Sequence, residues 1–354
     1  MKLTYNKIID NDIDEILSES LDWNAFAGKS VLVTGANGML PAYIVYTLLG
    51  LNETLLKNNK LKVYANVRNY EKAKDKFSLF LNRDDFELIV KDVVEFIDFN
   101  KHIDIVIHAA SQASPKYYGI DPVGTLKVNT IGTMNMLELA KRNNCERFLF
   151  ISSGEVYGVL DGTIPVIDET YTGNVDITNV RSCYAESKRM GETMCVSYAQ
   201  QYGIHVNMIR LAHTYGPGCA LDDGRVFADF VRNVINGEDI VVNSDGSAKR
   251  CFMYVTDMIK GLFYVLLKAK SSESFNVSSV EETSIKDLAT MLCSFYPEKH
   301  IKAHFTMVKD DKTYMKSKST CIVLANDRLV GLGWRQKVSV RDGFMRMIDS
   351  YILL

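Results

Sequence analysis

The chain has 354 residues, of which 47% are hydrophobic and 24% charged, and its formal net charge at pH 7 is -2. These are the values of a globular protein with a large buried core, so they exclude an intrinsically disordered chain and a long coiled coil. The balanced charge, with no long run of one sign, gives no electrostatic reason to expect nucleic acid or an anionic membrane as a partner.

The cysteines and the N-terminal segment bear on the compartment of the protein. The seven cysteines are scattered without the paired spacing of metal ligands, and their number is odd. Reduced thiols in a cytoplasmic protein without a bound metal are the simplest interpretation. The segment 1–20 contains several acids and no apolar core, and no stretch of the chain approaches the ~18 apolar residues of a membrane span. We therefore expect neither a secretory signal nor a membrane anchor.

Short apolar runs alternate with amphipathic stretches from residue 29 to residue 215. This alternation predicts an α/β fold, a doubly wound parallel sheet covered by helices on both faces. A helical extension, residues 1–28, is expected ahead of it, as a packing element or alternatively a lid or dimer element. The expected strands are Ser30–Thr34, Lys62–Val67, Phe86–Lys91, Asp104–Ala109, Arg147–Ser152 and His205–Leu211, and the longest intervening helices are Thr125–Arg142 and Ala185–Tyr202.

Beyond residue 215 the alternation becomes irregular, with short strands and helices mixed. We therefore expect two parts, one over 29–215 and a smaller C-terminal lobe over 216–354, to which the motifs that follow assign dinucleotide binding and substrate binding, respectively. Some segments of the second part are expected to return to the first.

A glycine-containing turn, Gly-Ala-Asn-Gly over 35–38, follows the first expected strand, and a helix is expected from Met39. Glycines in such a turn permit a positive φ and the close approach of a pyrophosphate, which free N–H groups at the helix start then hold. The turn predicts a Rossmann-type dinucleotide site whose residues are Gly35, Asn37, Gly38 and Met39.

Pro41 lies where a third glycine is usual in this fingerprint. Amide groups of the first helical turn have no intrahelical acceptor, and the fixed φ of proline suits that position. We therefore expect a slightly displaced helix and a retained cofactor.

The second expected strand ends without the acid that usually binds the ribose hydroxyls of NAD. Arg68 follows this strand and is interpreted as a cofactor residue, either pairing with the 2′-phosphate of NADP or lying over the adenine. Asp92, after the third strand, is placed to receive the adenine amino group, with a plain surface aspartate as the alternative. The expected cofactor is NAD, and NADP is not excluded.

Tyr184 and Lys188 lie four residues apart on an expected helix, hence on one face. A free tyrosine, with a pKa of about 10, is a poor base at neutral pH, but a nearby ammonium and a nicotinium charge stabilise the phenolate. Ser153, after the fifth strand, would hydrogen-bond the oxygen whose proton Tyr184 removes. Glu155 is interpreted as a carboxylate that removes a proton beside a ketone, or as a solvated loop acid.

These residues together resemble the extended short-chain dehydrogenase/reductase family, which includes the nucleotide-sugar epimerases and dehydratases. The resemblance covers residues 29–350 and is closest to the UDP-glucuronate decarboxylases. It implies an enzyme that binds NAD, oxidises a nucleotide-linked hexose at carbon 4, transforms the ketone and returns the hydride. The segments that carry it are ASQASPKYYGIDPVGTLKVNTIGT (110–133), CYAESKRMGETM (183–194), DDGRVFADFV (222–231) and DGSAKRCFMYVTD (245–257).

The resemblance also implies roles for individual residues. The two turn glycines and Asp92 contact the cofactor, and Lys188 also reaches the nicotinamide ribose. Arg250 holds the nucleotide diphosphate or a substrate carboxylate, since a guanidinium suits both anions, with a surface ion pair as the alternative. A homodimer joined through the two long helices is implied as well. The implied substrate residues are Tyr118, Asn129, Arg225 and Arg250.

Two further positions depart from the family pattern. Gly154 stands where dehydratases carry an aspartate and decarboxylases a serine, and glycine can do neither job. His213 replaces an asparagine usual in its segment, so it is interpreted as a substrate contact or as an ordinary packed residue.

Several functions therefore stay open at this point. UDP-glucuronate decarboxylation is the main hypothesis, because a β-keto acid loses carbon dioxide with little acid–base machinery. Epimerisation at carbon 4, or at carbons 3 or 5 with Glu155 as base, is the alternative, and 4,6-dehydration is disfavoured by Gly154. A catalytically inactive NAD-binding regulatory protein has only Pro41 and Gly154 in its support.

Overall fold

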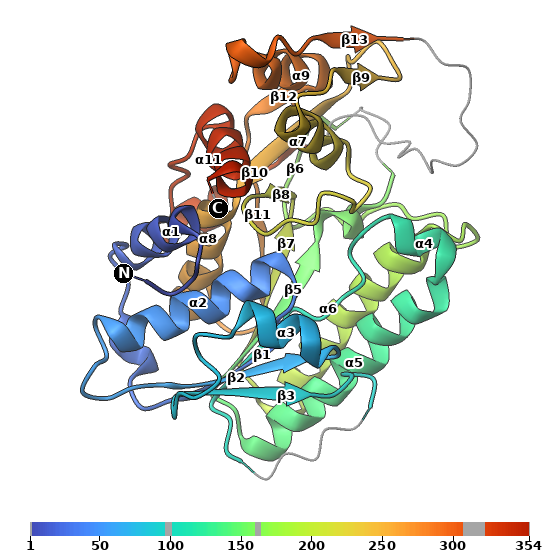
Figure 1. The fold of residues 1–354 in the computed structure, drawn as a ribbon. Helices are drawn as coiled ribbons and strands as arrows, with labels where there is room; N and C mark the ends of the chain where they lie inside the picture. Colours follow the sequence, from blue (N-terminus) through green and yellow to red (C-terminus); the bar gives the residue numbers. More distant parts are fainter. Residues whose placement is uncertain (1, 96–100, 160–163, 307–322, 354) are drawn as a thin grey trace.

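A seven-stranded sheet forms the centre of the computed structural model, which describes residues 2–95, 101–159, 164–306 and 323–353 (Figure 1). Its strand order is β11-β7-β5-β4-β1-β2-β3, and all neighbours are parallel. The predicted α/β class with a Rossmann-type parallel sheet is thereby confirmed. The strands are β1 (Ser30–Thr34), β2 (Lys62–Val67), β3 (Phe86–Val90), β4 (Ile105–His108), β5 (Arg147–Ser153), β7 (Val206–Leu211) and β11 (Glu273–Val277).

Helices cover both faces of this sheet, and alternate strand residues supply the two cores. Val31 and Val33 pack with α2 and α8 in the larger core, whereas Leu32 packs with α5 and α6 in the smaller one. The covering helices are α2 (Met39–Glu53), α3 (Tyr70–Lys76) and α8 (Val255–Lys268) on one face and α5 (Pro122–Asn143) and α6 (Ser182–Tyr202) on the other (Figure 1).

The helix starts are set by local chemistry. α2 begins at Met39, as predicted, with Pro41 inside its first turn. α5 begins at Pro122, three residues before the predicted start, because Asp121 accepts a hydrogen bond from the N–H of Gly124 and proline suits the first helical position. α6 also begins three residues earlier than predicted, at Ser182.

The remaining elements build small sheets beside the carboxyl ends of the central strands. The sheet β12-β10-β8 and the pairs β13-β9 and β14-β6 come mainly from the C-terminal part. β11 joins the central sheet, so the boundary near residue 215 stays a proposal about organisation. The elements are α4 (Lys116–Ile120), η2 (Gly154–Tyr157), β6 (Val166–Ile167), β8 (His213–Tyr215), α7 (Val226–Asn236), β9 (Ile240–Val242), β10 (Lys249–Tyr254), β12 (Glu282–Ser284), α9 (Ile285–Cys293), η3 (Pro297–Lys299), β13 (Ala303–Phe305), β14 (Val323–Leu324), α10 (Asp327–Gly331) and α11 (Val340–Ile352).

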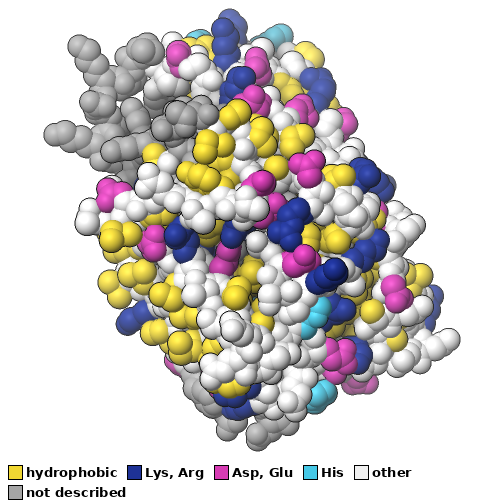
Figure 2. All heavy atoms as spheres, turned by 180° about the vertical axis from the view of Figure 1, so that it is seen from behind, with side chains coloured by type: hydrophobic (Ala, Val, Ile, Leu, Met, Phe, Trp, Pro, Cys, Tyr) yellow, Lys and Arg dark blue, Asp and Glu magenta, His cyan; other side chains and the backbone are white. Residues whose placement is uncertain are grey.

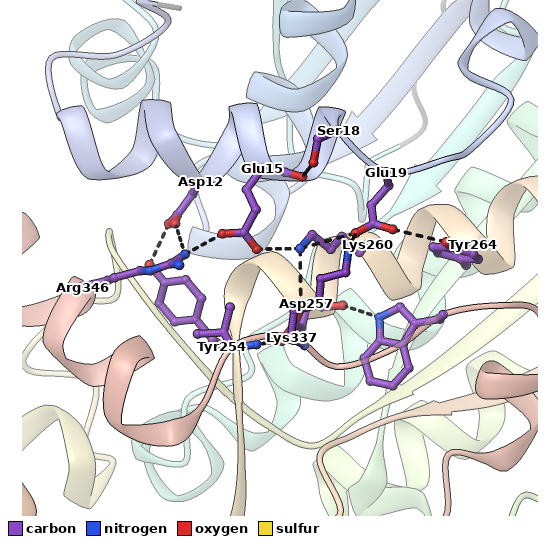
Figure 3. A network of polar contacts seen from close by, with 12 residues as sticks. Asp12, Glu15, Ser18, Glu19, Tyr254, Asp257, Lys260, Tyr264, Lys337 and Arg346 are labelled. Atoms are coloured by element: carbon purple, nitrogen blue, oxygen red, sulfur yellow. Dashed lines mark hydrogen bonds and ion pairs between the residues drawn. The ribbon is translucent and has the colours of Figure 1, made fainter.

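The N-terminal extension forms α1 (Lys7–Leu17) and η1 (Trp23–Phe26) and is packed into the molecule. α1 contacts α2, α8 and α11. The buried carboxylate of Asp12 accepts hydrogen bonds from the hydroxyls of Tyr43 on α2 (2.9 Å) and Tyr254 on β10 (2.7 Å) and pairs with Arg346 on α11. Figure 3 shows this network continuing through Glu15 to Lys260 of α8. The extension therefore ties α2, the helix that follows the glycine turn, to the C-terminal part.

No helix within the described ranges is long and apolar enough to cross a membrane.

Candidate active site

A cavity of 1340 Å³ opens where the central strands β1, β2, β4, β5 and β7 end. In open α/β sheets, ligands bind at this carboxyl edge. The glycine turn forms one end of the cavity, the loops after β4 and β5 form its middle, and β8, α7 and β10 form the other end. It is large enough for two ligands held end to end, a cofactor and a substrate.

The glycine turn has the geometry of a phosphate cradle. Gly35 has a φ of +69°, and a Cβ there would lie 2.8 Å from the Cα of Ala110, so only glycine fits. Gly38 is the N-cap of α2, and its carbonyl accepts the N–H of Ala42 at 3.1 Å. Pro41 therefore costs no hydrogen bond, since the residue after it closes the turn. The turn fits a dinucleotide pyrophosphate at the start of a fifteen-residue helix.

Asn37 and Met39 also line this end of the cavity. The Nδ2 of Asn37 donates to the carbonyl of Asn69 at 3.0 Å and ties the turn to the loop after β2. Its Oδ1 is buried and has no hydrogen-bond partner in the described part of the chain. Because buried polar atoms are normally hydrogen-bonded, this oxygen is suited to accept a hydrogen bond from a ligand.

No carboxylate directly follows β2, the position where this fold usually binds the adenosine ribose of the dinucleotide. β2 closes on the buried Val67, and the amide of Asn66 donates to the carbonyl of Lys91 at 2.8 Å. Arg68 follows and lines the cavity. Asp92 lies behind it, 3.7 Å from its guanidinium, and accepts the N–H of Val94. Arg68 therefore stands in the lining, whereas Asp92 does not.

Tyr184 and Ser153 meet in the middle of the cavity. The hydroxyl of Tyr184 is hydrogen-bonded with the side chains of Ser153 and Ser111, and its ring stacks on Tyr118 with centroids 4.9 Å apart. Burial raises the pKa of Tyr184 to about 12, a contribution that the two hydroxyls partly offset. At neutral pH this phenol is a proton donor until a positive charge arrives beside it.

Lys188 lies on the same face of α6 and is only 1% exposed. Its Nζ donates to the carbonyl of Ile151 at 2.8 Å and lies 5.9 Å from the Tyr184 ring centroid. Burial lowers the pKa of Lys188 to about 7. Beneath it, burial lowers the pKa of His108 to about 3, so this imidazole is neutral and adds no competing charge. The helix thus carries the predicted tyrosine and lysine together into the cavity.

Glu155 lines the cavity but is not a free loop acid. Arg181, the residue before α6, donates two hydrogen bonds to its carboxylate at 3.0 and 3.3 Å. The same guanidinium lies 6.0 Å from the Tyr118 ring centroid. The motifs predicted no role for Ser111 or for Arg181, although Arg181 lies only two residues before the CYAESKRMGETM segment.

Gly154 faces an apolar neighbour. A Cβ at this position would lie 3.0 Å from the Cδ1 of Leu324 on β14, and Leu324 also lines the cavity. The aspartate of dehydratases or the serine of decarboxylases is thus absent at this position, and Leu324 borders the space that such a side chain would occupy. No sequence pattern indicated this neighbour, because β14 has only two residues.

Arginines gather at the far end of the cavity. Arg225 lines it while donating to Asp223 at 2.6 Å and to the carbonyl of Thr214. Arg250 also lines it, and no acidic partner for it is found among the residues with described positions. His213 also lines the cavity, and desolvation by the surrounding cavity walls, together with the charge of Arg250, lowers its pKa to about 4. The positive charge here therefore comes from the arginines.

Two predicted substrate residues are placed differently from one another. Tyr118 lines the cavity, with its hydroxyl donating to the carbonyl of Ala113. Asn129 is fully buried on α5 beneath the cavity, where it accepts from Ser111 and donates to Ser187. Asn129 is thus arranged to position Ser111, and a substrate contact by it stays a prediction.

The parallel sheet, the glycine turn and the tyrosine–lysine pair define an enzyme of the dinucleotide-dependent dehydrogenase class. Comparison with family models matches residues 31–278 to the "NAD dependent epimerase/dehydratase family", and the chain belongs to this family. The resemblance inferred from the motifs is confirmed.

A curated relative, "UDP-glucuronic acid decarboxylase 6" of Arabidopsis thaliana, is 35% identical over 326 residues, which are 91% of this chain and 89% of the relative. Among solved structures, a UDP-N-acetylglucosamine 4-epimerase of Methanobrevibacter ruminantium M1 matches with a TM-score of 0.78 at 20% identity, covering 92% of this chain and 99% of that one. A UDP-glucuronic acid 4-epimerase of Bacillus cereus, solved with UDP-glucuronic acid and NAD, matches with a TM-score of 0.73 at 24% identity, covering 91% and 98%. These two structures share the fold.

Proposed function

We propose that this protein is a UDP-glucuronate decarboxylase, a UDP-xylose synthase that works through transient oxidation at carbon 4 of the sugar. The observation that carries the proposal is the convergence of Ser153, Tyr184 and Lys188 in one cavity with two arginines at its far end. Three curated relatives, each aligned with 91% of the chain, carry this activity in their names.

The cofactor would be held by the glycine turn at its pyrophosphate, with Arg68 and Asp92 at the adenosine end and Lys188 at the nicotinamide ribose. When bound, the nicotinamide accepts a hydride from carbon 4 and later gives it back, and it brings a positive charge next to Tyr184. That charge and the Lys188 ammonium lower the pKa of the phenol, so Tyr184 takes the proton of the carbon 4 hydroxyl. Ser153 and Ser111 hydrogen-bond the phenol oxygen of Tyr184, and Ser153 would also hydrogen-bond the oxygen on carbon 4.

The ketone at carbon 4 makes the substrate carboxylate the acid group of a β-keto acid. Its bond to carbon 5 breaks, the electron pair enters the ketone as an enolate, and carbon dioxide leaves. A proton returns to carbon 5, and reduction of the ketone gives the pentose. Arg250 suits the carboxylate or the diphosphate because a guanidinium donates two parallel hydrogen bonds to either. No acid is required at Gly154.

Replacing Arg250 by methionine is expected to lower kcat/KM for UDP-glucuronate by roughly 10- to 100-fold, because a charged hydrogen-bond partner of an anion is removed. Lys249→Met, at the exposed neighbouring position, is the matched control and should stay near wild type. The assay follows release of carbon dioxide and formation of a UDP-pentose. If the wild-type protein yields neither product from UDP-glucuronate, the proposed reaction is wrong.

Epimerisation is the second candidate, because the Glu155 carboxylate lines the same cavity as Ser153 and Tyr184. A base there would exchange a proton at carbon 3 or 5 with solvent. Turnover in deuterium oxide distinguishes the routes. Label at carbon 5 of a UDP-hexose indicates epimerisation with Glu155 as base, label at carbon 5 of a UDP-pentose accompanies decarboxylation, and inversion at carbon 4 leaves no label.

We also propose a homodimer in the cytoplasm, joined through α5 and α6. These helices lie side by side, and the Tyr198 hydroxyl links them by a 2.6 Å hydrogen bond to Glu138 (Figure 1). Met134 on α5 and Met190 on α6 are exposed. These helices lie on the right in Figure 1, and in the reversed view of Figure 2 hydrophobic side chains gather on the left. Such a surface is typical of an interface between subunits. The six cysteines in the described ranges are free thiols.

Met134→Glu combined with Met190→Glu is expected to convert the dimer to a monomer, because two charges per subunit would be buried at the interface. Light scattering coupled to size-exclusion chromatography measures the mass. The control pair, Leu55→Glu and Val241→Glu, places the same charges at exposed apolar positions away from α5 and α6. A monomeric wild type would contradict the proposal.

A further inference from the structure

The strongest unexplained feature of the site is the group of side chains at its ribose end. NAD-binding sheets of this kind place a carboxylate after the second strand, where it accepts hydrogen bonds from the ribose hydroxyls. Here β2 ends on Val67, whose side chain is buried and has no polar atom. The side-chain amide of the preceding residue, Asn66, donates hydrogen bonds to the carbonyls of Ile89 and Lys91. The strand end therefore offers the ribose no acceptor of this kind.

Two cations lie where the acceptor is missing. Arg68 directly follows β2, and Lys72 lies in the first turn of α3; both line the cavity together with the glycine turn. The Arg68 side chain is 62% exposed. No ion pair of Lys72 is found among the residues that the structure describes.

The backbone on both sides of Arg68 is fixed to the phosphate loop. The N–H of Ala36 donates to the carbonyl of Asn66 at 3.0 Å, and the Nδ2 of Asn37 donates to the carbonyl of Asn69 at the same distance. The Asn69 side chain in turn caps α3 by accepting the N–H of Lys72. Arg68 and Lys72 are thus held in register with the glycine turn that would bind the pyrophosphate.

The neighbouring acids leave the guanidinium available. Asp92 is 3.7 Å from Arg68, an ion-pair distance that is too long for a hydrogen bond, and its other oxygen accepts the N–H of Val94. Asp121 lies in the field of Arg68 but is engaged by Gln112 and the N–H of Gly124. A dianionic phosphate would compete well with one loosely held carboxylate for this fork of donors.

From this arrangement we propose that Arg68 and Lys72 bind the 2′-phosphate of NADP, so that this member of an NAD-dependent family accepts the phosphorylated dinucleotide at least as well as NAD. The inference rests on the cofactor site of the proposed function and concerns only its adenosine end. The chemistry at the nicotinamide is the same for both dinucleotides.

Calorimetric titration of the full-length, cofactor-stripped protein with NADP⁺ and with NAD⁺ tests this inference. The wild type should bind NADP⁺ as tightly as NAD⁺ or more tightly. Arg68→Gln should weaken NADP⁺ binding about 10- to 100-fold, and Lys72→Gln should weaken it by a smaller factor. Each variant should weaken NAD⁺ binding by a smaller factor than NADP⁺ binding, because NAD⁺ has no 2′-phosphate to lose as a partner. Lys74→Gln, an exposed lysine of α3 outside the cavity lining, is the matched control and should bind like the wild type.

Results that contradict this inference can be distinguished from results that contradict the proposed function. NADP⁺ binding more than about tenfold weaker than NAD⁺ binding in the wild type overturns this inference and leaves the proposed function standing. An equal loss of both dinucleotides in Arg68→Gln also overturns it, because Arg68 would then serve the adenine. Binding of neither dinucleotide by the wild type contradicts the cofactor site itself, and with it the proposed function.

Discussion

Tyr184→Phe is expected to lower kcat by about 10³-fold or more while the fold and the bound dinucleotide are retained. The substitution removes only the hydroxyl that takes the proton from the sugar, and general acid–base groups contribute typically 10²- to 10⁴-fold. The ring still stacks on Tyr118, and Lys188 keeps its hydrogen bond to Ile151. Steady-state rates with the active nucleotide sugar, combined with cofactor occupancy of the purified variant, measure the effect.

The matched control is Tyr117→Phe, which removes a hydroxyl from an exposed tyrosine of α4, the residue before Tyr118. This variant should keep near wild-type rates. Ser153→Ala should lower kcat less than Tyr184→Phe, because Ser111 still hydrogen-bonds the phenol. Wild-type turnover in Tyr184→Phe would show that another group is the base.

Lys260→Met is expected to lower the free energy of unfolding by about 3–5 kcal/mol, the usual result of removing one partner from a buried charge cluster. The Lys260 ammonium is 1% exposed and lies 2.6 Å from Glu15, 3.6 Å from Glu19 and 3.7 Å from Asp257 (Figure 3). Asp257 is fully buried, and its Oδ1 has no hydrogen-bond partner within the described ranges. Without the lysine, the buried negative charge of Asp257 has lost its nearest cation, and its repulsion with Glu15 and Glu19 is no longer offset.

Urea unfolding at two pH values measures this effect. Burial raises the pKa of Asp257 above its ordinary value. A group with a raised folded-state pKa favours folding when protonated and loses that contribution as pH rises through the folded pKa. The deficit of Lys260→Met should therefore be smaller at acid pH than at neutral pH. Lys337→Met, the half-exposed lysine that pairs with Glu19, is the control and should cost less than about 1 kcal/mol. Equal losses in both variants would contradict the assigned burial effect.

The features that follow a local period were predictable from the sequence. The six predicted strands and the two long helices came within three residues of their observed bounds, because each strand is a short apolar run and each of these helices has a long amphipathic pattern. Tyr184 and Lys188 meet because a four-residue spacing on a helix fixes their common face. The tolerance of Pro41 followed from its place in the first helical turn.

Features that depend on contacts between distant segments were not predictable. Leu324 reaches Gly154 from a two-residue strand, and the Arg181–Glu155 pair joins η2 to the start of α6, which only the folded chain brings together. The extension was predicted as a helix, but its polar links to α8 and α11 depend on tertiary packing. Asn129 was predicted as a substrate residue on the helix beneath the site, but its hydrogen bonds with Ser111 and Ser187 depend on the packing of α5 against α6.

The central claim is that Tyr184 removes a proton from a sugar alcohol as the hydride leaves the same carbon. Rapid mixing of the dinucleotide-loaded protein with UDP-glucuronate, followed by the near-ultraviolet absorbance of reduced nicotinamide, tests it most directly. We predict a transient rise and decay within one turnover in the wild type and no rise in Tyr184→Phe. Product formation by the wild type with no transient reduction, while carbon 4 deuteration leaves the rate unchanged, would contradict the claim.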